Sequence, residues 1–264
     1  MFIPVDDPGD ERIALFRLNE RGLANRPQRR SDAGAGWFLA EGDLVVERAL
    51  GAGCQPVAAL VDAERPPPVA AVLAGAVPVF AGGERLRAMV TGLGVPHPII
   101  TVFHRPPRPS VAGLIRGTRR IVMVEAVDNP VNVGGIVRNA AGLGWDGLIL
   151  DGTSADPLAR RALRVSMGHA VAFPHARLPS LAPAIGELRA AGFVVVALTP
   201  ATDAVDLDLI PRADRLAVVI GAERAGLDPT IQAAATVRAR IPMSAGVDSL
   251  NAAAASAIAC YALR

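Results

Sequence analysis

The sequence predicts an α/β fold, with a parallel sheet in the second half of the chain and a smaller α/β unit before it. In the second half, short apolar runs alternate with longer helical patterns, as is typical of parallel strands that helices cover on both faces. A proline-rich segment, residues 105–110, interrupts both patterns near the middle of the chain. We therefore expect a smaller N-terminal domain over 1–105, a linker over 106–119 and a C-terminal domain over 120–264.

The composition excludes several classes of protein. The chain has 264 residues, of which 51% are hydrophobic and 20% are charged, so it can bury a core without disulfides or metals. Cys54 and Cys260 form no C-x-x-C pair or Cys/His ladder, which argues against a disulfide scaffold or a zinc module and fits a reducing compartment. All 27 basic residues are arginines, and with 25 acidic residues the net charge is only +2. The total charge therefore does not indicate a nucleic-acid partner, and we expect no metal.

No membrane segment is expected. The N-terminus has acidic residues early and no basic region that leads into an apolar one, so it does not resemble a signal peptide. The longest nearly apolar run, residues 252–263, is shorter than the ~20 residues that span a bilayer. We interpret this run as a buried helix and expect a cytoplasmic protein.

The expected elements alternate in type along both halves. In the N-terminal domain they follow an arginine-rich polar run, and they are helices at 43–52 and 69–74 and strands at 56–61 and 77–80. The expected strands of the C-terminal domain are 121–127, 147–150, 193–199 and 216–221. Its expected helices are 133–143, 157–168, 181–191 and 249–263. Because ligands of parallel α/β sheets bind beyond the carboxyl ends of the strands, the residues that follow the strands are candidates for a site.

The loop after the strand at 121–127 leads into the first motif, N-x-G-x-x-x-R-x-A, which begins at Asn132. Asn132 is suited to the N-cap of the next helix, and Gly134 and Gly135 allow a ligand or another backbone to come close. Arg138 is expected about one turn into the helix, on the side that faces the strand ends. An alternative is that Asn132 only caps the helix and Arg138 only forms a surface ion pair.

The second motif, G-x-E-x-x-G-L, begins at Gly221 and contains Glu223. As a lone glycine-rich turn it is weak evidence for any function. This turn is not a G-x-G-x-x-G sequence, and the chain has no lysine for a G-x-x-x-x-G-K-[ST] loop. The turn is therefore neither a dinucleotide fingerprint nor a Walker loop.

The third motif, I-P-M-x(5)-S-L-N, runs from Ile241 to Asn251 and into the final helix. Asp248 or Ser249 is the expected N-cap of that helix. The alanines after it would let the helix pack very close to another backbone.

In this order, the three motifs resemble those of the SpoU (TrmH-type) branch of the SPOUT RNA methyltransferases. The resemblance covers residues 120–264, about half of the chain. Residues 166–170 also resemble the small-residue loop that the family places between its second helix and third strand. Less specifically, residues 38–42 and the helix after them are similar to the ribosomal-protein-like substrate-binding domain of members that act on ribosomal RNA.

The resemblance implies a C-terminal SPOUT domain with a trefoil knot, a homodimer formed through that domain, and S-adenosylmethionine as the cofactor. The implied reaction is methyl transfer to the 2′-hydroxyl of a ribose in RNA, with ribosomal RNA favoured over transfer RNA. The positions that match the family's cofactor-binding residues are Thr199, Gly221, Ile241 and Leu250. The positions that match its catalytic residues are Arg138, Asn132, Glu223, Ser249 and Asn251.

Arg138 is better suited to hold a phosphate and the reacting oxygen than to remove a proton, because a guanidinium stays protonated at neutral pH. We expect Asn132 to orient Arg138 or the ribose. Glu223 would hold the guanidinium through a charge-assisted pair. Ser249 and Asn251 would shape the pocket.

Other functions remain open on the sequence alone. The third motif has Ala245 where the family usually has glycine, so an inactive RNA-binding or ribosome-assembly module is an alternative. A nucleotide-binding oxidoreductase is disfavoured by the missing fingerprint. Four arginines of the polar run fit a solvated arm and contacts with RNA phosphates equally well; they are Arg21, Arg26, Arg29 and Arg30.

Overall fold

Two compact units make up the described part of the chain. The computed structural model describes residues 1–30, 33–92, 94–244 and 247–264. The first unit consists of Met1–Pro107 and Leu158–Ala172, and the second consists of Arg108–Pro157 and Phe173–Arg264. The contacts of Leu158–Ala172 thus place this segment in the first unit, although the residues before and after it in the sequence belong to the second unit. Within the described residues, no helix is long and apolar enough to cross a bilayer.

The second unit contains a seven-stranded sheet in the order β10-β12-β9-β11-β6-β7-β8, and each neighbouring pair is parallel. The strands are β6 (Arg120–Val124), β7 (Gly147–Leu150), β8 (His175–Arg177), β9 (Val194–Leu198), β10 (Val205–Asp206), β11 (Leu216–Ile220) and β12 (Val237–Arg240). The four strands expected from the sequence are β6, β7, β9 and β11. The other three are short and carry charged or imidazole side chains, so they lack the apolar run that marks a buried strand.

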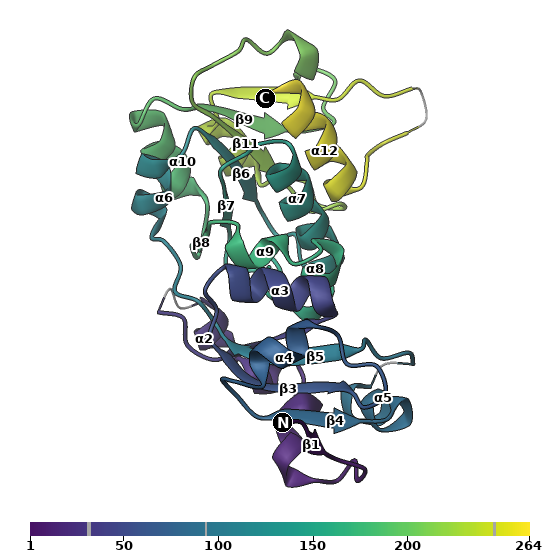
Figure 1. Cartoon of the computed structure of the whole chain (residues 1–264). Helices are drawn as coiled ribbons and strands as arrows, with labels where there is room; N and C mark the ends of the chain where they lie inside the picture. Colours follow the sequence, from purple (N-terminus) through teal and green to yellow (C-terminus); the bar gives the residue numbers. More distant parts are fainter. Residues whose placement is uncertain (31–32, 93, 245–246) are drawn as a thin grey trace. The chain divides into compact units, whose positions relative to one another are not determined.

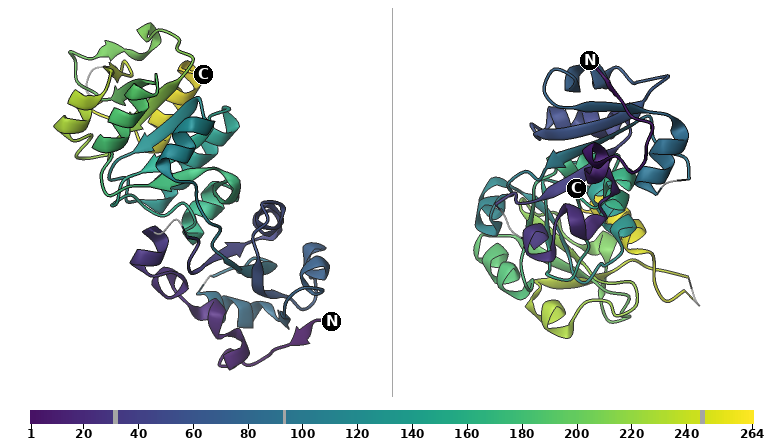
Figure 2. Two further views of the ribbon diagram at one scale, coloured as in Figure 1. Left: turned by 90° about the vertical axis from the view of Figure 1, so that its left-hand side faces the viewer. Right: turned by 90° about the horizontal axis from the view of Figure 1, so that it is seen from below.

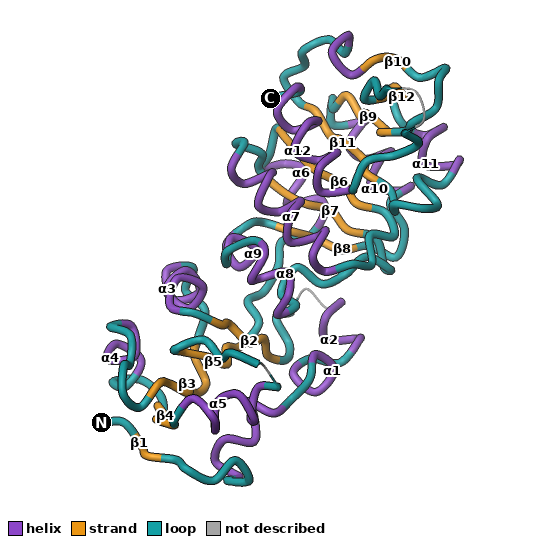
Figure 3. Tube along the Cα trace, turned by 90° about the vertical axis from the view of Figure 1, so that its right-hand side faces the viewer, coloured by secondary structure: helices purple, strands orange, loops and turns teal. Residues whose placement is uncertain are grey.

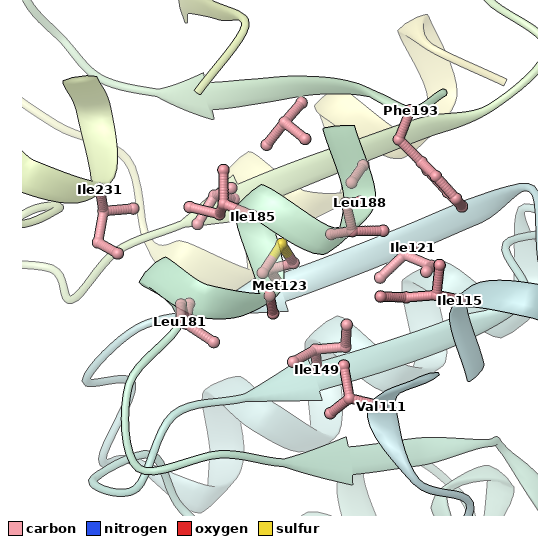
Figure 4. Close-up of a cluster of buried hydrophobic side chains, with 14 of the residues drawn as sticks. Val111, Ile115, Ile121, Met123, Ile149, Leu181, Ile185, Leu188, Phe193 and Ile231 are labelled. Carbon is pink, nitrogen blue, oxygen red and sulfur yellow. The ribbon is translucent and has the colours of Figure 1, made fainter. Parts of the chain in front are cut away.

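Helices cover both faces of this sheet, as predicted (Figures 1 and 2). They are α6 (Val111–Gly117), α7 (Pro130–Gly142), α10 (Ala182–Ala190), η2 (Leu207–Leu209), α11 (Pro229–Ala234) and α12 (Ala252–Ala262). On one face, α6, α10 and α11 pack over the strands in a cluster of buried apolar side chains (Figure 4), which includes Met123, Ile185 and Leu188. On the other face, α7 and α12 lie side by side (Figure 1). Burial of apolar surface, at about 25 cal/mol per Å², stabilises this arrangement.

The first unit contains a five-stranded mixed sheet in the order β1-β4-β3-β5-β2 (Figure 3). Its first three strands in that order are parallel, whereas β5 is antiparallel to β3 and β2. The strands are β1 (Ile3–Pro4), β2 (Trp37–Glu41), β3 (Pro56–Asp62), β4 (Val79–Gly82) and β5 (Ile99–His104). The helices are η1 (Glu11–Arg17), α1 (Glu20–Leu23), α2 (Arg26–Arg30), α3 (Asp43–Gly51), α4 (Val69–Leu73), α5 (Glu84–Thr91), α8 (Arg160–Val165) and α9 (His169–Ala172).

A buried arginine closes the carboxyl ends of β3 and β4. Arg87 of α5 is only 2% exposed. Its guanidinium donates to Asp62 Oδ2 at 2.5 Å, to the carbonyl oxygen of His97 at 2.6 Å and to that of Gly82 at 3.2 Å. Since Asp62 and Gly82 are the last residues of β3 and β4, this one side chain fills the space beyond two parallel strands.

Two further arginines hold helices of the first unit in place. Arg160 of α8 forms an ion pair with the buried carboxylate of Glu41, at the end of β2. Arg29 donates to the carbonyl oxygens of Glu20 and Ala24, at 3.1 and 2.6 Å. Arg29 therefore satisfies carbonyl groups of α1, which gives one arginine of the polar run a structural role.

Candidate active site

The carboxyl ends of four neighbouring strands meet at one edge of the second sheet. β12, β9, β11 and β6 lie in this order and are parallel, so the segments that leave them start side by side. A cavity of about 380 Å³ lies at the ends of β9, β11 and β12. The candidate site is therefore formed by the segments that follow these strands, where a parallel α/β sheet binds its ligands.

The four residues that the sequence assigns to cofactor binding all line this cavity: Thr199, Gly221, Ile241 and Leu250. Two of the predicted catalytic residues, Glu223 and Ser249, also contribute to its wall. Several other lining residues were not predicted as cofactor-binding or catalytic residues, among them Leu198, Arg224, Gln232, Met243 and Asp248. Most of them lie within a motif, whereas Gln232 is on α11, where no local pattern marks it.

The turn over residues 221–227 forms one wall of the cavity and depends on glycine at two positions. Gly226 has a φ of +68°, in the left-handed region that favours glycine. A Cβ on Gly221 would lie 2.4 Å from the carbonyl carbon of Gly226, so a side chain there would open the turn. Gln232 donates to the carbonyl oxygen of Leu227 at 3.0 Å, which fixes the end of the turn.

One polar side chain from each motif meets the other two beside the cavity. Asn132 Nδ2 donates to Glu223 Oε1 at 2.8 Å, and Asn251 Nδ2 donates to the same oxygen at 2.5 Å. Asn251 Nδ2 also donates to Asn132 Oδ1 at 2.9 Å. Asn132 is buried, whereas Glu223 and Asn251 are exposed. This amide–carboxylate cluster (Asn132, Glu223 and Asn251) thus presents a carboxylate of fixed orientation at the rim of the cavity.

The N-cap of α7 differs from the expectation. It is Asn129, whose side chain accepts a hydrogen bond from the N–H of Val131, and the helix begins at Pro130. Proline is favoured at the first helical position, where its missing N–H costs nothing. The prediction that Asn132 caps this helix is therefore wrong. Because Asn132 lies inside the helix, its amide is available to Glu223.

The N-cap of α12 also differs from the expectation. Asn251 Oδ1 accepts hydrogen bonds from the N–H groups of Ala253 and Ala254, at 3.0 and 3.2 Å. The prediction that Asp248 or Ser249 caps this helix is wrong, because the helix begins after Asn251. A single amide therefore caps α12 through its oxygen and joins the amide–carboxylate cluster through its nitrogen.

The two other predicted catalytic residues, Arg138 and Ser249, are both exposed. Arg138 is on α7, further along the helix than Asn132, and its side chain is exposed. Ser249 is exposed on the cavity wall. Ala245, the departure in the third motif, lies outside the described residues.

A second carboxylate lies near the turn over residues 221–227. Glu125 directly follows β6, and its Oε2 accepts a hydrogen bond from the N–H of Asp228, the N-cap of α11, at 2.8 Å. Burial raises the pKa of Glu125, and the hydrogen bond from Asp228 opposes this effect without cancelling it. Glu125 therefore ties the end of β6 to the end of the turn. The sequence analysis missed it, although a polar residue directly after a buried strand was the available signal.

The cavity fits S-adenosylmethionine in size and in chemistry. Its volume of about 380 Å³ lies within the ~300–1,000 Å³ that is usual for small-molecule sites. Its wall combines apolar side chains such as Leu198 and Ile241 with the backbone of the turn over residues 221–227. These groups suit a ligand that has an apolar ring and several hydrogen-bonding groups.

Comparisons with known proteins agree with this geometry. Residues 119–261 match the SpoU rRNA Methylase family. An uncharacterized tRNA/rRNA methyltransferase of Mycobacterium bovis is 38% identical over 262 residues, which cover 97% of this chain and 90% of that protein. The 23S rRNA (guanosine(2553)-2′-O)-methyltransferase RlmP of Bacillus subtilis is 29% identical over 86% of this chain and 88% of that protein.

The fold agrees with that of a solved structure as well. The crystal structure of an AdoMet-bound rRNA methyltransferase from Sinorhizobium meliloti has a TM-score of 0.83 and 27% identity, and the match covers 98% of this chain and 96% of that one. The family match alone covers more than half of the chain. The chain therefore belongs to the SpoU rRNA Methylase family and is an S-adenosylmethionine-dependent RNA methyltransferase.

Proposed function

We propose that the enzyme methylates the 2′-hydroxyl of a ribose in ribosomal RNA, in the cytoplasm. The observation that carries this proposal is the amide–carboxylate cluster at the rim of the cavity. RlmP, which aligns with 86% of this chain, is named for 2′-O-methylation of 23S rRNA. That likeness supports both the acceptor oxygen and the class of RNA.

Four cavity residues would hold the cofactor: Thr199, Gly221, Ile241 and Leu250. S-adenosylmethionine supplies a methyl group on a positively charged sulfur. The turn that starts at Gly221 can contact a ligand through its backbone, because the Gly221 position has no room for a side chain.

The catalytic residues would position the ribose and stabilise charge. Arg138 would hold the target phosphate and the 2′-oxygen and stabilise the negative charge that develops there. Because a guanidinium is already protonated, the proton of the hydroxyl would pass to phosphate or water. Asn132 and Asn251 fix the carboxylate of Glu223, which would then accept a hydrogen bond from the ribose or from the guanidinium. Ser249 would bound the pocket. Positioning of this kind can lower a barrier by ~7–11 kcal/mol.

Each domain would have one task. The N-terminal domain, residues 1–105, would bind the RNA, and residues 106–119 would link it to the C-terminal domain. The C-terminal domain, residues 120–264, would contain the trefoil knot, bind the cofactor and carry out the transfer.

The enzyme would act as a homodimer that forms through the C-terminal domain. Ile258 and Tyr261, one turn apart on α12, are 41% and 60% exposed, and Leu209 of the neighbouring η2 is 68% exposed. Exposed apolar side chains grouped in this way favour contact with a second protein surface. Sedimentation should therefore give a dimer for the native chain and a monomer for Tyr261→Asp. A native chain that is monomeric at micromolar concentration would contradict the homodimer.

The main experiment identifies the methylated atom and the class of RNA. The purified chain is incubated with S-adenosylmethionine and unmodified 23S rRNA, 16S rRNA or tRNA, and the RNA is digested for nucleoside mass spectrometry. We expect a 2′-O-methylnucleoside from ribosomal RNA. Glu223→Gln should lose most of this product. Arg116→Ala, an exposed position of α6 on the other face of the sheet, is the control and should keep it.

Three outcomes would overturn parts of the proposal. A methylated base would exclude the ribose hydroxyl as acceptor. Product from tRNA alone would replace the ribosomal substrate. If the cofactor binds in calorimetry but no RNA is methylated, an inactive RNA-binding module becomes the better description.

A further inference from the structure

α7 and α12 approach each other closely enough for side chains of one helix to reach the backbone of the other. Asn132, Gly135 and Asn139 lie at positions i, i+3 and i+7 of α7 and therefore share one face. A Cβ on Gly135 would lie 2.7 Å from the Cβ of Ala253 on α12. The missing side chain at Gly135 thus brings the first turn of α12 within reach of the two asparagines on either side.

Asn139 uses this approach to bind the first turn of α12. Its Nδ2 donates to the carbonyl oxygen of Ala253 at 2.7 Å and to Ser256 Oγ at 2.8 Å. Ser256 Oγ in turn donates to the carbonyl oxygen of Ala253 at 2.7 Å. Ser256 is fully buried, so these three polar groups depend on one another for hydrogen bonds.

The same turn is held from its other end by Asn251. The N–H of Ala253 binds Asn251 Oδ1, while the carbonyl oxygen of Ala253 binds Asn139. Asn251 Nδ2 then contacts Asn132 and Glu223. A continuous chain of hydrogen bonds therefore leads from Asn139, through the first turn of α12, to the carboxylate at the rim of the cavity.

We propose that Asn139 is a positioning residue, which sets the place of the Asn251 amide and through it the orientation of Glu223. The motif N-x-G-x-x-x-R-x-A leaves this position open, and no role proposed above uses it. The inference rests on the proposed function, because it assigns the positioning to the amide–carboxylate cluster.

The test removes the donors of Asn139 and keeps the size of the side chain. Asn139→Leu should lower kcat by about tenfold to a hundredfold, as a displacement of ~1 Å at a reacting group does, and leave the KM for RNA nearly unchanged. Asn139→Asp, which keeps the shape but replaces the donor with an acceptor, should act in the same direction. Ser256→Ala is the matched control. It preserves the bond from Asn139 to Ala253, so we expect a much smaller loss.

A double-mutant cycle separates positioning from a merely structural role. In the Asn251→Ala protein, Asn139→Leu should cause no further loss of kcat, since its effect passes through Asn251. Losses that multiply overturn the proposal. So does a native kcat in both Asn139→Leu and Asn139→Asp.

A measurement without turnover distinguishes this inference from the proposed function. The side-chain amide signal of Asn251 in a ¹H–¹⁵N spectrum should move in Asn139→Leu and stay in place in Ser256→Ala. If it moves while Asn251→Ala and Glu223→Gln keep full activity, the proposed catalytic role fails and the positioning by Asn139 stands. If the signal does not move in Asn139→Leu, the inference itself is wrong.

Discussion

The two sheets treat the carboxyl ends of their parallel strands in opposite ways. In the first unit, the guanidinium of Arg87 lies between the ends of β3 and β4 and binds both Asp62 and the carbonyl oxygen of Gly82. In the second unit, a glycine turn and the segments after β9, β11 and β12 leave a cavity of about 380 Å³ at the same place. Parallel strand ends thus become a ligand site only where no side chain of the protein already fills them.

The difference also separates two uses of charge. Arg87 is almost fully buried and all three of its described hydrogen bonds are to the first unit, so it stabilises the fold. Arg138 is exposed on α7, where a phosphate can reach it. Substitutions at these two arginines should therefore change different quantities.

The largest effect is expected on turnover, from Arg138. Arg138→Ala should lower kcat by about 10²–10³, the usual cost of removing one group that stabilises developing charge. The melting temperature should stay native because the side chain is exposed. Arg138→Lys should recover only part of kcat, since an ammonium cannot replace a bidentate fork. Full turnover in Arg138→Lys, measured with labelled cofactor, would remove the clamp role.

The next effect is expected on the stability of the first unit. Arg87→Met breaks the ion pair of the buried guanidinium and leaves two carbonyl groups without their hydrogen-bond donor. The free energy of unfolding, measured with urea, should fall by about 3 kcal/mol. Arg85→Met, at an exposed position of the same helix, is the control and should cost less than about 0.5 kcal/mol. Affinity for the cofactor, measured by calorimetry, should be native in both. An Arg87→Met protein as stable as Arg85→Met would break the comparison.

A smaller effect on the free energy of unfolding is expected where α7 and α12 of the second unit approach each other at Gly135. Gly135→Ala adds a methyl group that meets Ala253 at 2.7 Å, and overpacking of this kind costs about 1–3 kcal/mol. Adding Ala253→Gly to that variant should restore much of the loss. Gly142→Ala, near which a Cβ meets nothing within 4 Å, should be neutral or stabilising by up to about 1 kcal/mol. Equal unfolding curves for the Gly135 and Gly142 variants would contradict the close crossing.

The sequence predicts the second unit better than the first for a physical reason. The first two motifs follow strands that are buried on both faces, and such strands read as continuous apolar runs, as β6 and β11 do. The third motif follows β12, which has no such run. Which strands become neighbours depends on packing between distant segments, so the order that brings β12, β9, β11 and β6 together cannot be derived from local patterns.

The geometry of the cluster was only partly predictable. The sequence identifies Asn132, Glu223 and Asn251, but the choice of helix caps depends on backbone angles. Both Asn129 and Asn132 are acceptable N-cap residues, and Pro130 at the first helical position decides between them in favour of Asn129. In the first unit, the partner of Arg87 could not be predicted, because Asp62 lies on another element and no motif links the two.

The smallest effects are expected from changes in pH. The carboxylates at the strand ends of the two units, Asp62 and Glu125, should change the stability of the protein with pH in opposite directions. Burial would raise the pKa of Asp62, but hydrogen bonds from the N–H groups of Glu64 and Arg65 and the charge of Arg87 outweigh it, so its pKa lies below the usual value. For Glu125, burial prevails and its pKa lies above the usual value. Ionised Asp62 therefore stabilises the folded state, whereas ionised Glu125 costs stability.

Thermal unfolding of Asp62→Asn and Glu125→Gln from about pH 2 to pH 8 checks this contrast. Asp62→Asn should be less stable than the native chain at neutral pH, and the difference should shrink as the pH falls through the pKa of folded Asp62, below ~3.9. Glu125→Gln keeps an oxygen for the N–H of Asp228. It should match the native chain near pH 4 and become the more stable protein as the pH rises above ~4.3. The part of each difference that changes with pH should stay below about 1 kcal/mol, or 2–4 °C in Tm. If both variants lose stability at neutral pH, the hydrogen bond from Asp228 outweighs burial at Glu125, and the strand ends of the two units do not differ in this respect.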